Sequence, residues 1–139
     1  MTFTMSKTFI DTNILVYSLD QADPQKQAKA RALLKTARTS QTGVLSTQVL
    51  QEFYVVATGK LKLEPPLAKK ITRSMANFTT VTVDFLLIEE AMDICQSDNL
   101  SFWDALIVAA ASSAGCRAIW TEDLNHSQVV RGVEIINPF

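Results

Sequence analysis

Four acidic side chains occupy positions where a strand ends or where a helix should be apolar. They are Asp11, Glu52, Asp104 and Asp123. Asp11 directly follows an apolar run at residues 8–10, and Asp123 comes two residues after a second run that ends at Thr121. On helical spacing, Glu52 and Asp104 fall on apolar faces. Because the carboxyl ends of parallel strands meet at one edge of a sheet, all four carboxylates can face one pocket.

Such a pocket predicts metal-dependent hydrolysis of a phosphodiester. Carboxylates packed together repel one another unless a cation lies among them. Oxygen donors without Cys or His favour Mg²⁺ or Mn²⁺ over zinc. Such a metal lowers the pKa of an attacking water and stabilises the charge on the phosphoryl oxygens.

Each acid also has a purely structural explanation when it is taken alone. Asp11 can be a helix N-cap, and Ser101-x-x-Asp104 matches a capping box. Asp123 can be a turn former. Glu52 has the weakest such explanation, since an unpaired carboxylate on an apolar stripe is costly to bury. The conjunction of all four favours a reactive site.

The elements that must position these acids alternate along the chain. Strand-like runs occur at residues 8–10, 43–45, 79–83, 118–121 and 133–136, and helices are predicted from about residues 13, 24, 47, 65, 86 and 101. This alternation predicts an α/β fold, with a parallel sheet of about five strands and helices on both faces. No internal repeat or boundary divides it, so residues 1–139 are expected to form a single domain.

Composition excludes several other classes of protein. The 139 residues are 47% hydrophobic and 19% charged, which is typical of one compact domain and not of a disordered chain. The longest apolar run, residues 105–111, is far shorter than the ~18 residues that span a membrane. The N-terminus shows no basic segment followed by an apolar block, so no targeting segment and a cytoplasmic location are expected.

The net charge of −1 hides a strong segregation. Residues 24–73 carry ten basic and two acidic side chains, a net charge of +8, whereas residues 84–139 carry two basic and nine acidic side chains, a net charge of −7. A basic segment suits a polyanion, because releasing the counterions of phosphates drives association. The alternative is that these side chains only solvate the outer faces of two helices.

Four short motifs, in this order, resemble those of the PIN-domain family. They are Phe9-Ile-Asp-Thr-Asn13, Gln48-Val-Leu-Gln-Glu-Phe53, Ser101-Phe-Trp-Asp-Ala105 and Ile119-Trp-Thr-Glu-Asp123. Each motif is weak alone, but the ordered set is fairly specific and covers essentially the whole chain. The chain is most similar to the VapC-type toxins of toxin–antitoxin pairs.

The resemblance implies a single PIN-like nuclease domain with a set of named site residues. It implies a Mg²⁺- or Mn²⁺-dependent endoribonuclease whose catalytic and metal-binding quartet is Asp11, Glu52, Asp104 and Asp123. The supporting polar groups would be Thr12, Asn13, Ser101 and Thr121. At the fourth motif the family spacing favours Asp123, with the adjacent Glu122 as the alternative.

Within that quartet, roles can be assigned in outline. Asp11 and Asp104 would be the principal ligands of a first metal ion, and Glu52 would contact it directly or through water. Asp123 would hold a second ion or orient the attacking water. The sequence leaves open whether one or two ions operate.

The resemblance also implies partners. They are an RNA substrate, a second copy of the chain in a homodimer, and a small antitoxin protein whose C-terminal segment reaches into the active site; no membrane is involved. Candidate RNA contacts in the basic segment are Lys69, Lys70 and Arg73. Candidate base-stacking residues are Trp103, Tyr54 and Phe53, for which core packing is the alternative.

Two rival functions remain to be weighed. A phosphoacceptor receiver domain is also a small α/β sheet with an acidic pocket, and Asp84 follows the third strand-like run. That class needs a second acid beside Asp11 and a lysine after the fifth strand, and both are missing. The second rival is a non-catalytic RNA-binding PIN-like module that keeps the fold and the basic half, against which the intact quartet argues.

Overall fold

The computed structural model describes residues 6–139. The first five residues, which belong to the segment for which no targeting signal is expected, lie outside the described residues. The strands are β1 (Thr8–Ile10), β2 (Gly43–Ser46), β3 (Thr79–Val81), β4 (Ala118–Trp120), β5 (Val129–Val130) and β6 (Val133–Ile136). The helices are α1 (Thr12–Tyr17), α2 (Pro24–Ser40), α3 (Thr47–Thr58), α4 (Pro65–Met75), α5 (Phe85–Asp98) and α6 (Phe102–Ser113).

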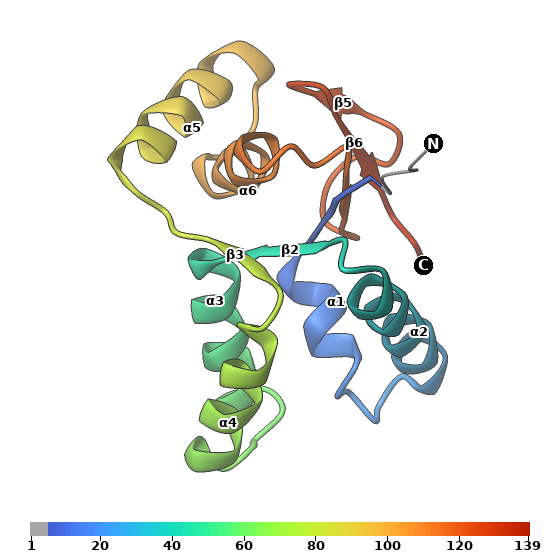
Figure 1. Ribbon diagram of the computed structural model, residues 1–139. Coiled ribbons are helices and arrows are strands. Elements are labelled where there is room, and N and C mark those ends of the chain that lie inside the picture. Colours follow the sequence, from blue (N-terminus) through green and yellow to red (C-terminus); the bar gives the residue numbers. More distant parts are fainter. Residues whose placement is uncertain (1–5) are drawn as a thin grey trace.

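These strands form one sheet in the order β3-β2-β1-β4-β6-β5 (Figure 1). All neighbouring strands are parallel except β5 and β6. Helices cover both sides of the sheet (Figure 1). The predicted α/β fold with a mostly parallel sheet is therefore confirmed.

The sheet has six strands where the sequence predicted about five. The additional strand, β5, pairs Val130 with Val133 in an antiparallel hairpin. Arg131 and Gly132, between them, have positive φ angles of 51° and 77°, as a two-residue type I′ turn requires. A two-residue strand is too short to show the period-two pattern by which strands are found in a sequence.

The strand order places β1 next to β4 at the centre of the sheet, although about a hundred residues separate them in the chain. β1 pairs with β4 in parallel register, with Phe9 opposite Ile119. The chain builds β2 and β3 on one side of β1 and then crosses to β4 on the other side. In open parallel sheets, this reversal of direction leaves a crevice at the carboxyl ends of the two central strands. Asp11 and Thr121 stand at those two ends.

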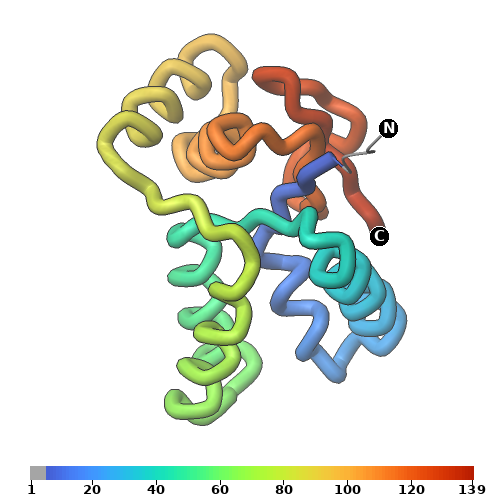
Figure 2. Tube along the Cα trace, viewed as in Figure 1, coloured from blue at the N-terminus to red at the C-terminus, as the bar shows by residue number. Residues whose placement is uncertain are grey.

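Two layers of helices enclose the sheet. Figures 1 and 2 show α5 and α6 on one side and α1 to α4 on the other. Residues 105–111 of α6 are all buried, as expected for a helix that is apolar on every side, and α5 packs against it. α3 and α4 pack together and extend away from the sheet (Figure 2). No helix within residues 6–139 is both long and apolar enough to cross a membrane.

Several element boundaries differ from the sequence prediction by one or two residues. Two of these differences have an identifiable reason. α1 begins at Thr12, one residue earlier than predicted, because the Asp11 side chain caps it. β3 ends at Val81 and not at residue 83, since the Val83 N–H donates to Thr47 Oγ1 (3.1 Å) and not to the neighbouring strand.

Candidate active site

Asp11 lies in the crevice between β1 and β4 and is only 7% exposed. Its Oδ1 accepts from the Thr12 backbone N–H (2.7 Å), and its Oδ2 accepts from the Thr121 hydroxyl (2.8 Å). Burial raises the pKa of the Asp11 carboxyl to about 6 in spite of these bonds, and the nearby charges of Glu52 and Asp123 add to the effect. Asp11 is therefore an N-cap, but this explanation is incomplete, because its second oxygen accepts from Thr121 and not from the helix.

Thr121 connects Asp11 to the fourth motif. The Thr121 hydroxyl, fully buried, donates to Asp11 and accepts from the Asn13 side-chain amide (3.2 Å) and from the Asp123 backbone N–H (3.1 Å). The same Asn13 amide also donates to Asp123 Oδ2 (3.1 Å). The predicted supporting residues Asn13 and Thr121 thus hold Asp123, which is itself exposed, at the mouth of the crevice.

Glu52 reaches the same place from α3. The Thr12 hydroxyl donates to Glu52 Oε2 (2.8 Å), and the Gln48 amide donates to Glu52 Oε1 (3.0 Å). The sequence analysis missed Gln48, although it lies one helical turn before Glu52 on the same face. Its amide also donates to the Trp103 carbonyl (3.3 Å), which fixes the first turn of α6 beside Glu52.

Among the described residues, Asp104 is the one member of the quartet that shares no hydrogen bond with the others or with their partners. Its backbone N–H donates to Ser101 Oγ (3.2 Å), so Ser101 caps α6. Within residues 6–139 the Asp104 carboxylate makes no hydrogen bond or ion pair, and the return bond of a capping box is not formed. The nearest link to the other acids is the bond between Gln48 and Trp103. The assignment of Asp104 as a ligand stays a prediction.

A cavity of about 470 Å³ opens in front of these acids. It is lined by Thr12, Asn13, Val16, Tyr17, Glu52, Val56, Lys60, Glu122 and Asp123. Of the polar residues in this lining, two, Tyr17 and Lys60, were not predicted from the sequence. Tyr17 lies on the apolar stripe of a short helix, and Lys60 follows a helix end, so neither position carries a local signal of function.

The structure separates the two neighbouring acids of the fourth motif. Lys26 Nζ donates to Glu122 Oε2 (2.8 Å), and the Tyr17 hydroxyl donates to Glu122 Oε1. Partial burial opposes ionisation of Glu122, but these bonds outweigh it and hold its pKa below the usual range. Lys26 also lies over the rings of Tyr17 and Phe139. Both oxygens of Glu122 are therefore engaged by the protein, whereas Asp123 points toward Asn13.

The carboxylate and amide oxygens around the crevice are suitable ligands for a divalent cation. Within residues 6–139 no three Asp, Glu, His or Cys side chains are grouped closely enough to hold a metal ion by themselves. Mg²⁺ does not need such a cage, because it usually binds through one or two carboxylates, waters and substrate phosphates. Asn13 Oδ1 and Gln48 Oε1 are buried oxygens without a partner among the described residues, and they flank Asp123 and Glu52. A cation with its waters would satisfy such oxygens.

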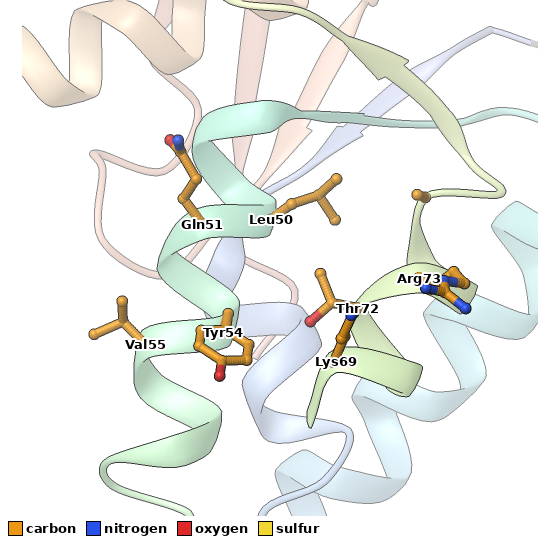
Figure 3. A pocket seen from close by; sticks show the side chains of 8 residues that line it. Leu50, Gln51, Tyr54, Val55, Lys69, Thr72 and Arg73 are labelled. Atoms are coloured by element: carbon orange, nitrogen blue, oxygen red, sulfur yellow. The ribbon is translucent and has the colours of Figure 1, made fainter. Parts of the chain in front are cut away.

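The predicted RNA-contact residues lie elsewhere on the molecule. Lys69 and Arg73 of α4 line a groove of about 650 Å³ together with Tyr54 of α3, and Figure 3 shows Tyr54 beside Lys69. Lys70 is exposed but does not line this groove. Since Tyr54 and Glu52 line different cavities, α3 separates the groove from the acids.

Of the three aromatic residues considered for base stacking, the structure excludes one. Phe53 is 0% exposed and belongs to the hydrophobic core, so the alternative of core packing is confirmed for this residue. An aromatic side chain on the inner face of an amphipathic helix is buried when that helix packs. Trp103 and Tyr54, at 64% and 38% exposed, remain accessible to a base.

Solved structures with the same fold include toxin–antitoxin proteins. Mycobacterium tuberculosis VapC20, a toxin that cleaves the sarcin–ricin loop, is 19% identical, with 84% of this chain and 90% of that chain covered and a TM-score of 0.66. A toxin–antitoxin complex from Klebsiella pneumoniae gives 18% identity, 96% and 98% coverage and a TM-score of 0.69. DNA-bound VapBC from Salmonella typhimurium gives 16% identity, 97% and 100% coverage and a TM-score of 0.68.

Sequence comparison gives the family. A search of curated proteins found no match to this chain. The family model of the PIN domain matches residues 8–132. This range includes all four acidic motifs and every strand and helix except β6. This chain therefore belongs to the PIN-domain family.

Proposed function

We propose that this protein is a metal-dependent endoribonuclease that hydrolyses RNA phosphodiester bonds. The observation that carries the proposal is the hydrogen-bonded network that joins Asp11, Glu52 and Asp123 from three separate elements at the switch point of the sheet. Folding brings these like charges together and buries Asp11, which raises its pKa, and buried acids with raised pKa values in a crevice are typical of functional sites. Membership of the PIN-domain family and the fold shared with an RNA-cleaving toxin support it.

The residues of the chain divide the work. Asp11, Glu52 and Asp123 would hold Mg²⁺ or Mn²⁺, with Asp104 as a further ligand. When bound, the cation would lower the pKa of a water molecule and neutralise charge on the phosphoryl oxygens. Thr121 and Thr12 fix the orientation of the Asp11 and Glu52 carboxylates through their hydroxyl groups. Asp123, exposed and held by Asn13 through one oxygen, presents its other oxygen toward solvent, where it can orient the attacking water.

We assign Asp123, and not Glu122, as the acid of the fourth motif. Glu122 already accepts from Lys26 and Tyr17, and releasing it would leave a lysine and a tyrosine hydroxyl without their partner. Its role in this proposal is to hold the segment after β4 against α1 and α2, so that Asp123 keeps its place.

Cleavage of a labelled single-stranded RNA by the purified protein in Mg²⁺ or Mn²⁺ tests the proposal. We expect cleavage that EDTA abolishes and that an Asp11→Asn/Asp104→Asn variant lacks. Cleavage that persists in EDTA or in this variant would contradict the assignment of the site. Comparing Asp104→Asn alone with the wild-type protein measures the contribution of Asp104 to cleavage.

One alternative rests on Asp104, which lies outside the hydrogen-bonded network of the described residues: a non-catalytic RNA-binding PIN-like module. A site whose fourth acid does not join this network could bind RNA without holding the cation tightly enough to cut it. The same assay separates the two functions: RNA that is bound but stays intact at saturating Mn²⁺ would support the module.

We also propose that the chain is the toxin of a toxin–antitoxin pair, acts in the cytoplasm and forms a homodimer. The fold shared with two toxin–antitoxin complexes supports this role.

Growth arrest on induced expression, relieved by co-expression of a small protein encoded beside it, is the expected result. Arrest that is equally strong for Asp11→Asn would mean that toxicity does not depend on this site. Light scattering of the purified chain measures whether two copies associate.

A further inference from the structure

We propose that Lys60 is a phosphate-binding residue that holds the backbone of the RNA beside the acidic site. The inference rests on the proposed ribonuclease function and adds to it a substrate contact. Lys60 is the only cationic side chain among the described residues that line the acidic cavity.

The position of Lys60 follows from the geometry of α3. Glu52, Val56 and Lys60 are spaced four residues apart and all line the same cavity, as expected for one face of a helix. α3 ends at Thr58 with Gly59 as its C-cap, but the following turn stays attached to it: the Leu61 N–H donates to the Val56 carbonyl (3.1 Å). Lys60 therefore has a fixed backbone position at the end of the stripe that begins with Glu52.

The next residues anchor this turn to the protein. The Leu63 N–H donates to the Ala57 carbonyl (2.9 Å), and the side chains of Leu61 and Leu63 pack against the hydrophobic core. Lys60, which is exposed, directly precedes the first of these two anchored positions. The turn thus presents the Lys60 ammonium group from a fixed backbone, which suits contact with a flexible phosphate backbone.

The charge of Lys60 is not used within the protein. The only other lysine near this cavity, Lys26, is bound to Glu122 at 2.8 Å. Within residues 6–139 Lys60 forms no ion pair. Asp20 lines a small neighbouring cavity with Lys60, but it is buried and accepts from the Ala22 N–H (3.0 Å).

The positive charge of Lys60 can offset the repulsion between the acidic cavity and an RNA. The cavity carries the carboxylates of Glu52, Glu122 and Asp123, which repel the phosphates of an approaching RNA. Because Lys60 lies beyond the end of α3, about two helical turns after Glu52, we expect it to bind a phosphate next to the one that is cut and not the reacting phosphate itself. We therefore expect Lys60 to affect binding of RNA more than the chemical step.

Equilibrium binding of a labelled single-stranded RNA tests the inference. An Asp11→Asn background prevents cleavage during the measurement, and salt is varied. Adding Lys60→Gln should weaken binding about five-fold and reduce the slope of log K against log[salt] by about 0.7, the value for one lost phosphate contact on a single strand. Lys60→Arg should restore both. The matched control is Lys62→Gln, an exposed lysine of the same loop that lines neither cavity.

Cleavage kinetics in the otherwise wild-type protein provide the second readout. Lys60→Gln should raise KM about five-fold with kcat within two-fold, and thermal unfolding should be unchanged because the side chain is exposed. Equal effects of Lys60→Gln and Lys62→Gln on the salt slope would overturn the role of Lys60 while RNA cleavage by the wild-type protein upholds the proposed function. A wild-type protein that neither binds nor cleaves RNA would overturn both.

Discussion

Asp11 shows at the scale of one residue how folding creates a reactive group. Three bonds hold it at the end of β1: its backbone N–H donates to the Trp120 carbonyl (3.1 Å), and its carboxylate accepts from Thr12 and Thr121. Burial nevertheless outweighs these bonds, so the pKa lies near 6. The ionised carboxylate that a cation needs is thus prepared at the expense of stability.

Replacing this carboxylate should stabilise the metal-free protein. The pKa of Asp11 is about 6 in the folded state, above its ordinary value of 3.8, so the folded state binds the additional proton between these values and stability falls as the pH rises from about 4 to about 6. At pH 8 the ionised, buried carboxylate of Asp11 lowers the free energy of unfolding by about 3 kcal/mol. Asp11→Asn, which keeps the shape and removes the charge, should raise the Tm in EDTA by several degrees at pH 8 and much less at pH 4.

Thermal unfolding followed by circular dichroism measures both values. Mg²⁺ should raise the Tm of the wild-type protein at pH 8 and leave that of Asp11→Asn unchanged, because only the wild-type protein has the ligand. A lower Tm for Asp11→Asn in EDTA at pH 8 would mean that the lost charge matters less than the weakened bond to Thr121.

The two acids of the fourth motif should respond oppositely to loss of charge. Asp123→Asn should reduce kcat at least 100-fold and leave the Tm within about 1 °C, because Asp123 is exposed and its one side-chain bond is to Asn13. Glu122→Gln should lower the Tm through loss of the ion pair with Lys26 and reduce kcat less than ten-fold. Cleavage rates and melting curves of the two variants side by side decide between the acids; the reverse pattern in kcat would assign the site to Glu122.

At the scale of elements, the site depends on β2, which ends at the cap of α3. Gly43 at the start of β2 packs under the ring of Phe78: a Cβ built on Gly43 would lie 2.6 Å from Phe78 Cδ1 and 3.2 Å from Ala37 Cβ. The close approach of α2, β2 and the segment after α4 therefore requires a residue without a side chain at this position.

Gly43→Ala should lower the free energy of unfolding by about 1–3 kcal/mol, because the ring and the strand must move apart. Chemical denaturation of the single variant and of Gly43→Ala/Phe78→Ala measures the coupling. If the ring is the cause, the substitution at Gly43 should cost much less in the Phe78→Ala background. Equal costs in both backgrounds would place the strain at Ala37.

At the scale of the whole molecule, charge is divided between two regions. The basic residues predicted to contact RNA lie on α4, next to the groove that contains Tyr54, while the acids lie in the crevice on the other side of α3. If RNA is the substrate, as we propose, the basic surface on α4 and the acidic crevice would contact two separate parts of it.

Neutralising Lys69, Lys70 and Arg73 together should weaken RNA binding and reduce the salt slope by about 2, with kcat unchanged, because about 0.7 is lost per phosphate contact. The measurement is the same salt titration of binding, with Arg117→Gln, an exposed cation of the acidic half, as control. An unchanged slope in the triple variant would mean that these side chains only solvate α4.

The sequence by itself determined the type of fold and which residues are candidates for the site, because both depend on local patterns. Period-two and helical spacing identified five of the six strands and all six helices, and they placed Asp11 after a strand and Glu52 on an inward face. Asp104 and Ser101 were found by the same local signal, and of the two only Ser101 has an observed role, as a cap.

Only the tertiary structure decided which of these residues meet. The order of the strands, which puts β1 next to β4, depends on crossovers between distant segments and not on any local pattern. The directions of Glu122 and Asp123 depend on Lys26 and Tyr17, which lie about a hundred residues earlier in the chain. Lys60 gained its place from the packing of the turn after α3. Residue types and spacing therefore specify the chemistry, and long-range packing specifies the geometry in which it can occur.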